Sequence, residues 1–236
     1  MIYFLYPMYL TKHELKSTLV VSGIFSLRLL GLFVLLPIFS IYASEYNNSS
    51  SFLAGIAIGS YSLSQAIMQV PMGYLSDKFG RKKIVLFGLA LFVVGSAICF
   101  YAIDITILII GRIIQGLGAI SSVGIATLSE NTSEERRASA FTIMGISVGF
   151  AFVVGFIAGP FISTLYSFKS LFLLLLVLGV IAIIITILYY PIDKNTKNQD
   201  FSLKLSYNHS LLQVYMGSFF LSLILSIMLY IYPLIW

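Results

Sequence analysis

Seven apolar stretches, each about as long as a membrane-spanning helix, follow one another along the chain with polar connections between them. They lie at about residues 17–43, 52–74, 84–102, 105–128, 138–164, 170–190 and 211–234. An α-helix needs about 20 apolar residues to cross the roughly 30 Å hydrocarbon core of a bilayer. The stretches lack the strict alternation of strands, and open sheets leave backbone groups unpaired in lipid. We therefore predict an all-α membrane protein with seven transmembrane helices.

The composition supports a membrane protein and excludes several other classes. Of the 236 residues, 59% are hydrophobic and 10% are charged, against about 45–50% and about 25% in soluble domains. The formal net charge of +5 comes from cations scattered between the apolar stretches, whereas a nucleic-acid-binding protein gathers its cations on one face. We therefore predict no nucleic-acid partner, and membrane lipids are the expected surroundings.

No pattern in the sequence predicts an enzyme. His13 and His209 lie near the ends of predicted spans, and no H-E-x-x-H motif occurs. Every acidic residue falls in or beside a predicted loop, so no buried acid is available as a general base. The phosphate-binding pattern G-x4-G-K-[ST] is also missing. We predict no catalytic residue, no metal site and no nucleotide cofactor.

Lysine and arginine are distributed unequally between the two sides of the predicted membrane domain. One side carries eleven of them and the other carries only Lys169. Cytoplasmic loops are enriched in Lys and Arg, so we predict a multi-pass protein with a cytoplasmic N-terminus. The predicted organisation is a cytoplasmic segment, a six-helix bundle, a polar cytoplasmic linker and a seventh helix, at residues 1–16, 17–190, 191–208 and 209–236.

The connection between the second and third predicted spans has a distinctive sequence. Residues 73–83 read GYLSDKFGRKK and join the two helices across about ten residues. Gly73 allows close helix approach, and Gly80 allows a positive φ in a tight turn. Asp77 can pair with Arg81, and the neighbouring cations hold the connection in the cytoplasm.

Two arginines are predicted inside the membrane, where a charge is costly. In the fourth span, Arg112, Gln115 and Gly116 have the i, i+3, i+4 spacing of one helix face. Arg112 lies about 10 Å into its span and Arg28 about 16 Å into the first span, at about 1.5 Å per residue. Inserting a charge at the centre of a span costs about 2.5–3.5 kcal/mol. Because no acidic residue lies inside a span, the partner of these arginines is either a carboxylate of a second bundle or an anionic substrate.

A polar stripe and a pair of glycine motifs complete the set of candidate residues. Tyr61, Gln65 and Gln69 lie at successive i+4 positions of the second span, where they either line a transport path or form interhelical hydrogen bonds. In the fifth span, two small-xxx-small pairs flatten one helix face and a proline is predicted to kink the helix. These residues are Gly145, Gly149, Gly155, Gly159 and Pro160.

The spacing G-x3-D-x2-G-R-K of residues 73–82 resembles the signature loop of the major facilitator superfamily. In that family the loop is understood to lock two six-helix halves together on the cytoplasmic side. The resemblance implies that Glu130, at the end of the fourth span, is the acidic partner of Arg81. The implied gate consists of Gly73, Asp77, Gly80, Arg81, Lys82 and Glu130.

Two further motifs are similar to those of proton-coupled members of this superfamily. The R-x-x-Q-G pattern at Arg112 resembles the span-four motif whose arginine is understood to influence proton transfer. The alternative is a structural arginine that pairs with backbone carbonyls. The ending Gly155-x3-Gly159-Pro160 resembles a motif of the antiporter branches, although the glycine pair expected after the proline is replaced by Ile-Ser-Thr. As a whole, residues 17–190 resemble YajR-type proton-linked drug antiporters of the bacterial inner membrane.

The resemblance implies a secondary active transporter that couples proton movement to efflux of small amphiphilic molecules by alternating access. Its expected partners are lipids, a small-molecule substrate and protons, with the proton gradient as energy source and no cofactor. One alternative is an organic-anion transporter of the same fold. Another is a half-transporter without independent activity, because the chain ends after a seventh span and would then need a separate second half or self-association.

Overall fold

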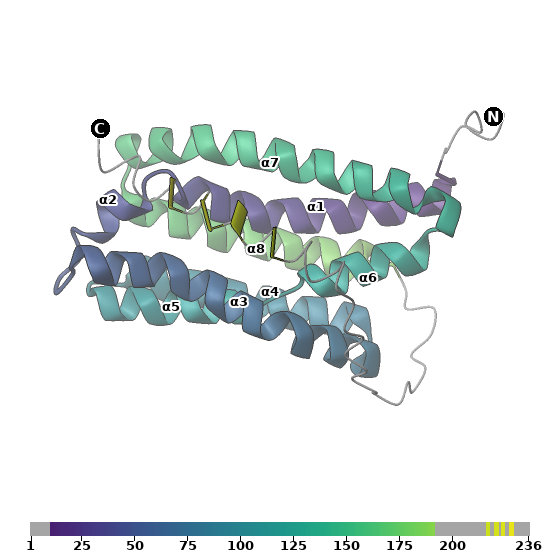
Figure 1. Ribbon diagram of the computed structural model, residues 1–236, viewed down its shortest axis with the longest axis horizontal. Helices are drawn as coiled ribbons and strands as arrows, with labels where there is room; N and C mark the ends of the chain where they lie inside the picture. The colour runs from purple at the N-terminus through teal and green to yellow at the C-terminus, as the bar shows by residue number, and fades with distance from the viewer. Residues whose placement is uncertain (1–9, 192–215, 218–219, 222, 225–226, 229–236) are drawn as a thin grey trace.

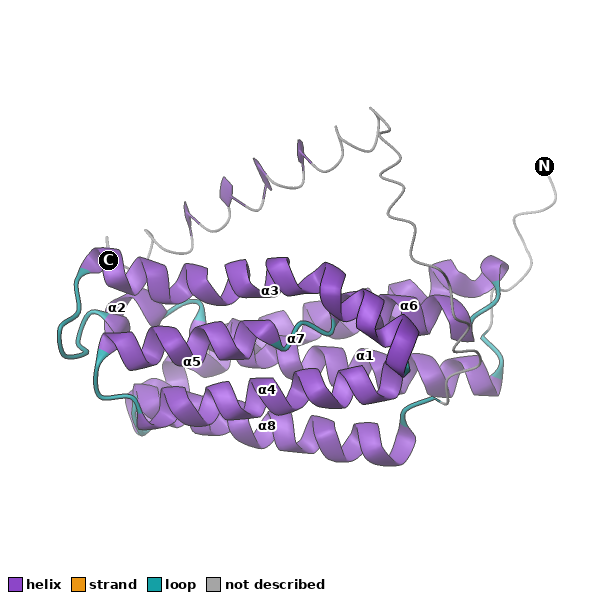
Figure 2. Cartoon of the chain, turned by 90° about the horizontal axis from the view of Figure 1, so that it is seen from below, coloured by secondary structure: helices purple, strands orange, loops and turns teal. Residues whose placement is uncertain are grey.

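The computed structural model describes residues 10–191 and, beyond them, residues 216–217, 220–221, 223–224 and 227–228. Its helices are α1 (Lys12–Leu35), α2 (Phe39–Ala43), α3 (Ser51–Phe79), α4 (Arg81–Tyr101), α5 (Ile105–Leu117), α6 (Ser121–Asn131), the 3-10 helix η1 (Glu134–Arg136), α7 (Arg137–Leu165) and α8 (Phe168–Tyr189). No strand occurs within 10–191 (Figure 2). Six spans are long and apolar enough to cross a membrane, with α5 and α6 counted as one. The all-α membrane fold is confirmed, while the predicted linker and most of the seventh helix lie outside the described residues.

The helices run side by side along the long axis of the molecule (Figure 1). The closest packing is between α1 and α7, between α4 and α8, and between α5 and both α3 and α4. The end of the bundle at which α3 and α6 finish and α1, α4 and α7 begin is called the motif end below. It holds Thr11, Gly80 and Asn131.

The first span differs from its predicted limits at both ends. It begins at Lys12 because Thr11 and Glu14 form a capping box, in which the Thr11 hydroxyl accepts from the Glu14 N–H and the Glu14 carboxylate accepts from the Thr11 N–H. It ends at Leu35, just before Pro37, and α2 follows as a separate short helix. The predicted continuous helix over 17–43 is therefore wrong, since a proline disrupts the helix that precedes it.

The fourth span is not the continuous helix that its hydropathy predicts. It is broken between α5 and α6 at residues 118–120, where a Cβ on Gly118 would collide with the carbonyl oxygen of Gly88 in α4. Gln69 of α3 occupies the N-terminal end of α6: its Oε1 accepts from the Ser122 N–H at 3.1 Å. The break thus rests on contacts with residues far away in the sequence.

The predicted loop at residues 73–83 is almost entirely helical. Helix α3 continues to Phe79 and α4 begins at Arg81, so Gly80 alone lies outside a helix. Its φ of 95° confirms the predicted positive φ and is a conformation that glycine adopts without strain. A Cβ on Gly73 would lie at an ordinary 3.5 Å from the Ser122 hydroxyl, so the close helix approach predicted there is not found.

Only one of the two glycine pairs of α7 lies in a close helix contact. A Cβ on Gly155 would lie 2.8 Å from the Phe33 Cβ of α1, and a Cβ on Gly159 would collide with the Val34 carbonyl oxygen. By contrast, nothing lies within 4 Å of the Cβ positions of Gly145 and Gly149. Helix α7 continues through Pro160 to Leu165.

Candidate functional site

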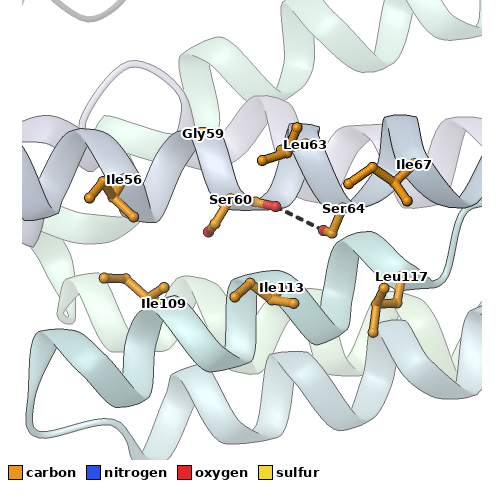
Figure 3. Close-up of a pocket in the computed structure, with 9 residues that line it drawn as sticks. All are labelled: Ile56, Gly59, Ser60, Leu63, Ser64, Ile67, Ile109, Ile113 and Leu117. Carbon is orange, nitrogen blue, oxygen red and sulfur yellow. Dashed lines mark hydrogen bonds between the residues drawn. The ribbon is translucent and has the colours of Figure 1, made fainter.

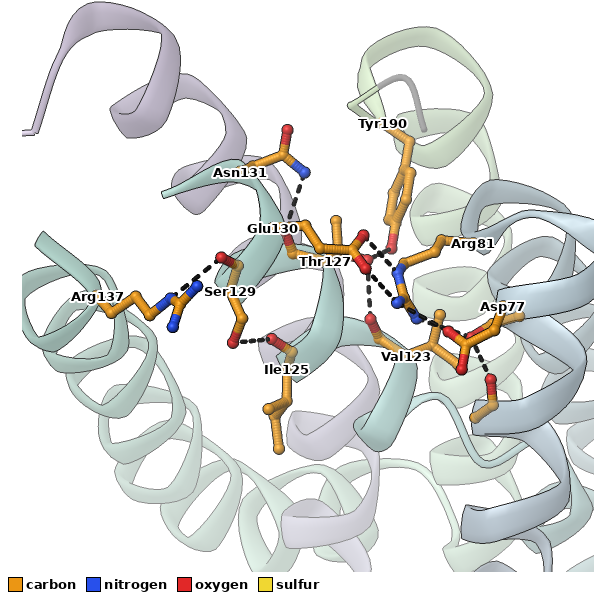
Figure 4. A network of polar contacts seen from close by, with 12 residues as sticks. Asp77, Arg81, Val123, Ile125, Thr127, Ser129, Glu130, Asn131, Arg137 and Tyr190 are labelled. Atoms are coloured by element: carbon orange, nitrogen blue, oxygen red, sulfur yellow. Dashed lines mark hydrogen bonds and ion pairs between the residues drawn. The ribbon is translucent and has the colours of Figure 1, made fainter. Parts of the chain in front are cut away.

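At the motif end, Arg81 lies between carboxylates from two different helices (Figure 4). Its Nη2 is 2.8 Å from Asp77 Oδ1, one turn away across Gly80. Its Nε donates to Glu130 Oε2 of α6 at 2.8 Å, and its Nη1 donates to the Ser76 hydroxyl at 2.9 Å. The Arg81 side chain is only 11% exposed, whereas the two carboxylates are about half exposed, at 52% and 48%. Three of the four predicted gate charges, Asp77, Arg81 and Glu130, are thus brought into one network.

The end of α8 is bound to residues next to this network, which the sequence did not predict. Thr127 donates its only hydroxyl hydrogen to the Val123 carbonyl at 2.8 Å. The 2.7 Å contact between Thr127 and Tyr190 therefore has Tyr190 as its donor. Lys82 Nζ donates to the Ile187 carbonyl of α8 at 2.7 Å. No short motif marks Thr127 or Tyr190, and only the folded contacts identify them.

A further carboxylate at the motif end, that of Glu14, joins α1 to the connection between α6 and α7. Glu14 is 8% exposed and accepts from the Ser133 N–H at 3.0 Å and from Arg136 Nη1 at 3.0 Å. It also accepts from the Thr11 N–H and hydroxyl, both at 2.8 Å. The capping-box pattern of Thr11 and Glu14 is a sequence signal that predicts the first half of this arrangement.

Inside the bundle, Arg112 is held by hydrogen bonds and by aromatic rings. Its Nη1 donates to Gln115 Oε1 at 2.9 Å, and its Nε donates to the Ala57 carbonyl at 3.4 Å. Its guanidinium carbon lies 4.5 Å from the centroid of the Tyr61 ring and 5.2 Å from that of Phe39, within the range of cation–π attraction. Arg112 and Gln115 are both buried, as their shared helix face predicted.

Arg28 also lies near Tyr61 but has fewer partners than Arg112. Its Nη2 donates to Gln65 Oε1 at 3.4 Å, and its guanidinium carbon lies 6.0 Å and 5.8 Å from the ring centroids of Tyr61 and Phe92. Arg28 is 1% exposed and Arg112 is 2% exposed. In this conformation both arginines are therefore buried inside the bundle.

The polar stripe of α3 is divided between two environments. Tyr61 and Gln65 contact the buried arginines, whereas Gln69 binds Ser122 of α6 through its side chain and through its backbone carbonyl, which accepts from the Ser122 hydroxyl at 2.8 Å. Of the two interpretations of the stripe, interhelical hydrogen bonding therefore describes Gln69.

An apolar groove of about 620 Å³ runs between α3 and α5 (Figure 3). This volume lies within the roughly 300–1,000 Å³ of ligand sites. None of the predicted site residues is among those that line the groove, and its polar side chains, Ser60 and Ser64, belong to α3. The lining residues are Ile56, Gly59, Ser60, Leu63, Ser64, Ile67, Ile109, Ile113 and Leu117.

The family follows from a match along most of the chain. The sequence description of the Major Facilitator Superfamily matches residues 21–235. The chain belongs to this superfamily. The relatives named below are transporters and not enzymes.

Two relatives within the superfamily are similar over much of the chain. An uncharacterized transporter of Buchnera aphidicola subsp. Schizaphis graminum is 38% identical over 227 residues, covering 93% of this chain and 58% of that protein. The inner membrane transport protein YajR of Escherichia coli is 38% identical over 182 residues, covering 77% and 40%. This chain thus spans less than two thirds of the length of these relatives. More distant relatives have the names of drug-efflux and resistance proteins.

A solved structure supports the superfamily fold. The POT family transporter PepTSo matches with a TM-score of 0.70 at 12% identity, covering 94% of this chain and 52% of that chain. At this identity the likeness concerns the fold alone.

Proposed function

We propose that this member of the superfamily exports small amphiphilic molecules in exchange for protons, by alternating access. The observation that carries the proposal is the position of Arg81 between Asp77 and Glu130. Asp77 is four residues before Arg81 in the chain, whereas Glu130 lies on the distant helix α6. Arg81 can therefore keep one carboxylate as its partner while it separates from the other. Such an arrangement suits a gate with two discrete states.

Proton coupling is supported by the surroundings of Arg112. A guanidinium remains charged at physiological pH, and in this bundle it is enclosed by neutral partners, among them Gln115 and the Tyr61 ring. Gln115 Nε2 in turn donates to the Ser96 hydroxyl of α4 at 2.8 Å. A fixed charge in such a place raises the energy of any further positive charge nearby, which favours release of a proton. The drug-resistance names of the more distant relatives support an exported amphiphile.

The test is transport by the full-length product in proteoliposomes, with ethidium as the probe and pyranine to report pH. We expect ethidium movement driven by a pH gradient, and proton release when ethidium is added. Arg112→Gln should insert normally but lower coupled transport about tenfold or more, the effect of losing charged hydrogen bonds worth about 1.5–3 kcal/mol. Arg112→Lys keeps the charge and serves as the matched control. Ethidium movement that ignores the pH gradient would count against the antiport.

We also propose that the motif end faces the cytoplasm of a bacterial inner membrane, with the N-terminus on that side. Lys82 and Lys83 lie at the motif end, and Lys169 lies near the far end of the bundle. Because cytoplasmic loops carry an excess of Lys and Arg, this distribution supports a cytoplasmic motif end. In spheroplasts, a membrane-impermeant maleimide should label Lys169→Cys at once and Lys83→Cys only after lysis. The native Cys99 is fully buried and should remain unlabelled. Labelling in the reverse order would contradict this orientation.

A further inference from the structure

Arg28 is a buried cation whose hydrogen-bond donors are mostly unused. Among residues 10–191, its Nε and Nη1 have no hydrogen-bond partner, and the bond of its Nη2 to Gln65 is a long 3.4 Å. Arg112 differs, since two of its nitrogens have acceptors. An unpaired charge in a low-dielectric interior is strongly destabilising. We therefore expect Arg28 to have a negative partner.

No carboxylate of the described residues reaches Arg28. Those residues carry their acids at helix ends or in loops: Glu14, Glu45, Asp77, Asp104, Glu130, Glu134 and Glu135. Arg28 forms no ion pair with any of them within 4.0 Å. A side chain from helices outside this bundle is also hindered, because Arg28 is only 1% exposed. The missing charge therefore has to come from something small enough to enter the bundle.

A second unpaired donor belongs to a tyrosine whose ring lies near this guanidinium. The Tyr61 hydroxyl is buried and has no hydrogen-bond partner within the described part of the chain, and the Tyr61 ring is 6.0 Å from the Arg28 guanidinium carbon. Phe92 of α4 is also close, with its ring centroid 5.8 Å from the Arg28 guanidinium carbon. Arg28, Tyr61 and Phe92 are each 1% exposed, so a ligand enclosed with them between α1, α3 and α4 has to be a small ion and not an organic molecule.

We propose that a small monovalent anion of about the size of chloride binds between α1 and α3, held by the Nε and Nη1 hydrogens of Arg28 and by the Tyr61 hydroxyl. Both donors suit an anion, since hydrogen bonds with a charged partner are the strong ones. The ion neutralises the buried guanidinium within the bundle itself. This site does not depend on the proposed transport function, because binding is measured without transport.

The test uses the purified full-length protein in lipid nanodiscs, with sodium gluconate as the starting salt because gluconate is too large for the site. Chloride then replaces gluconate at constant sodium, and the thermal unfolding midpoint is followed by intrinsic fluorescence. Because an ion that binds the native state stabilises it, we expect a saturable rise of the midpoint. Acetate in a parallel titration distinguishes a halide site from a site for a small carboxylate, and a saturable response to either supports the proposal.

Three variants make the assignment specific. R28Q should abolish the chloride response, K169Q should keep it despite the loss of one positive charge, and Y61F should weaken chloride binding about tenfold. A midpoint that does not respond to either anion would overturn the proposal, as would an R28Q protein that responds like wild type. Should R28Q fail to fold, Y61F decides alone, and an unchanged chloride affinity would overturn the site.

Discussion

The same substitution, glycine to alanine, is expected to have opposite effects at two positions of α7. At Gly159 the new methyl group would meet the Val34 carbonyl oxygen of α1, a backbone atom that cannot turn aside. Overpacking of this kind costs about 1–3 kcal/mol. At Gly149 nothing lies within 4 Å of the new methyl group, and alanine favours a helix over glycine by about 1 kcal/mol.

Gly159→Ala should therefore lower the free energy of unfolding, and Gly149→Ala should leave it unchanged or raise it. Both are measured by unfolding the protein from mixed micelles with increasing SDS. Gly145→Ala serves as a second control, since its Cβ position is also free of neighbours. Equal effects at Gly159 and Gly149 would mean that α1 and α7 do not meet as described.

Removal of the Arg81 charge is expected to open the motif end. In Arg81→Gln the carboxylates of Asp77 and Glu130 lose the cation between them, and the Ser76 hydroxyl loses its donor. Hydrogen bonds to charged groups contribute about 1.5–3 kcal/mol, and the half-exposed carboxylates favour the lower limit because water screens them. Local opening should thus become about tenfold more frequent.

Hydrogen exchange of the backbone amides measures this opening directly. Exchange should accelerate at residues 76–84 and 125–131, while residues 105–112 of α5 keep the wild-type rate. Lys83→Gln removes a neighbouring exposed cation and should leave every rate unchanged. If Lys83→Gln accelerated exchange as much as Arg81→Gln, the effect would belong to the net charge of this end and not to the network.

The first six spans and the family could be predicted because both depend on short-range features of the chain. Apolar length predicts a span, and the spacing of Asp77, Gly80 and Arg81 predicts a turn with a nearby ion pair. Glu130 was assigned to Arg81 by resemblance, and the 2.8 Å hydrogen bond between them agrees with that assignment.

Features that depend on contacts between distant residues could not be predicted. The glycine pairs ending at Gly149 and Gly159 have the same pattern, yet only the second contacts α1. Gln65 and Gln69 belong to one stripe, but the first binds a buried arginine and the second binds the start of α6. In each case the role of the residue depends on which helix packs against it, and the local sequence does not predict that packing.

The break at residues 118–120 divides the fourth span into two short helices, α5 and α6, joined by three non-helical residues. Helix α5, which carries Arg112, packs tightly against α3, since a Cβ on Gly116 would collide with the Tyr61 carbonyl oxygen. Glu130 lies on α6, a separate helix, and the break at residues 118–120 leads us to expect that α6 can be displaced without α5. Spin labels on α6 should therefore report displacements that labels on α5 do not share. The fourth span would then consist of one helix that stays in place and one that moves during transport.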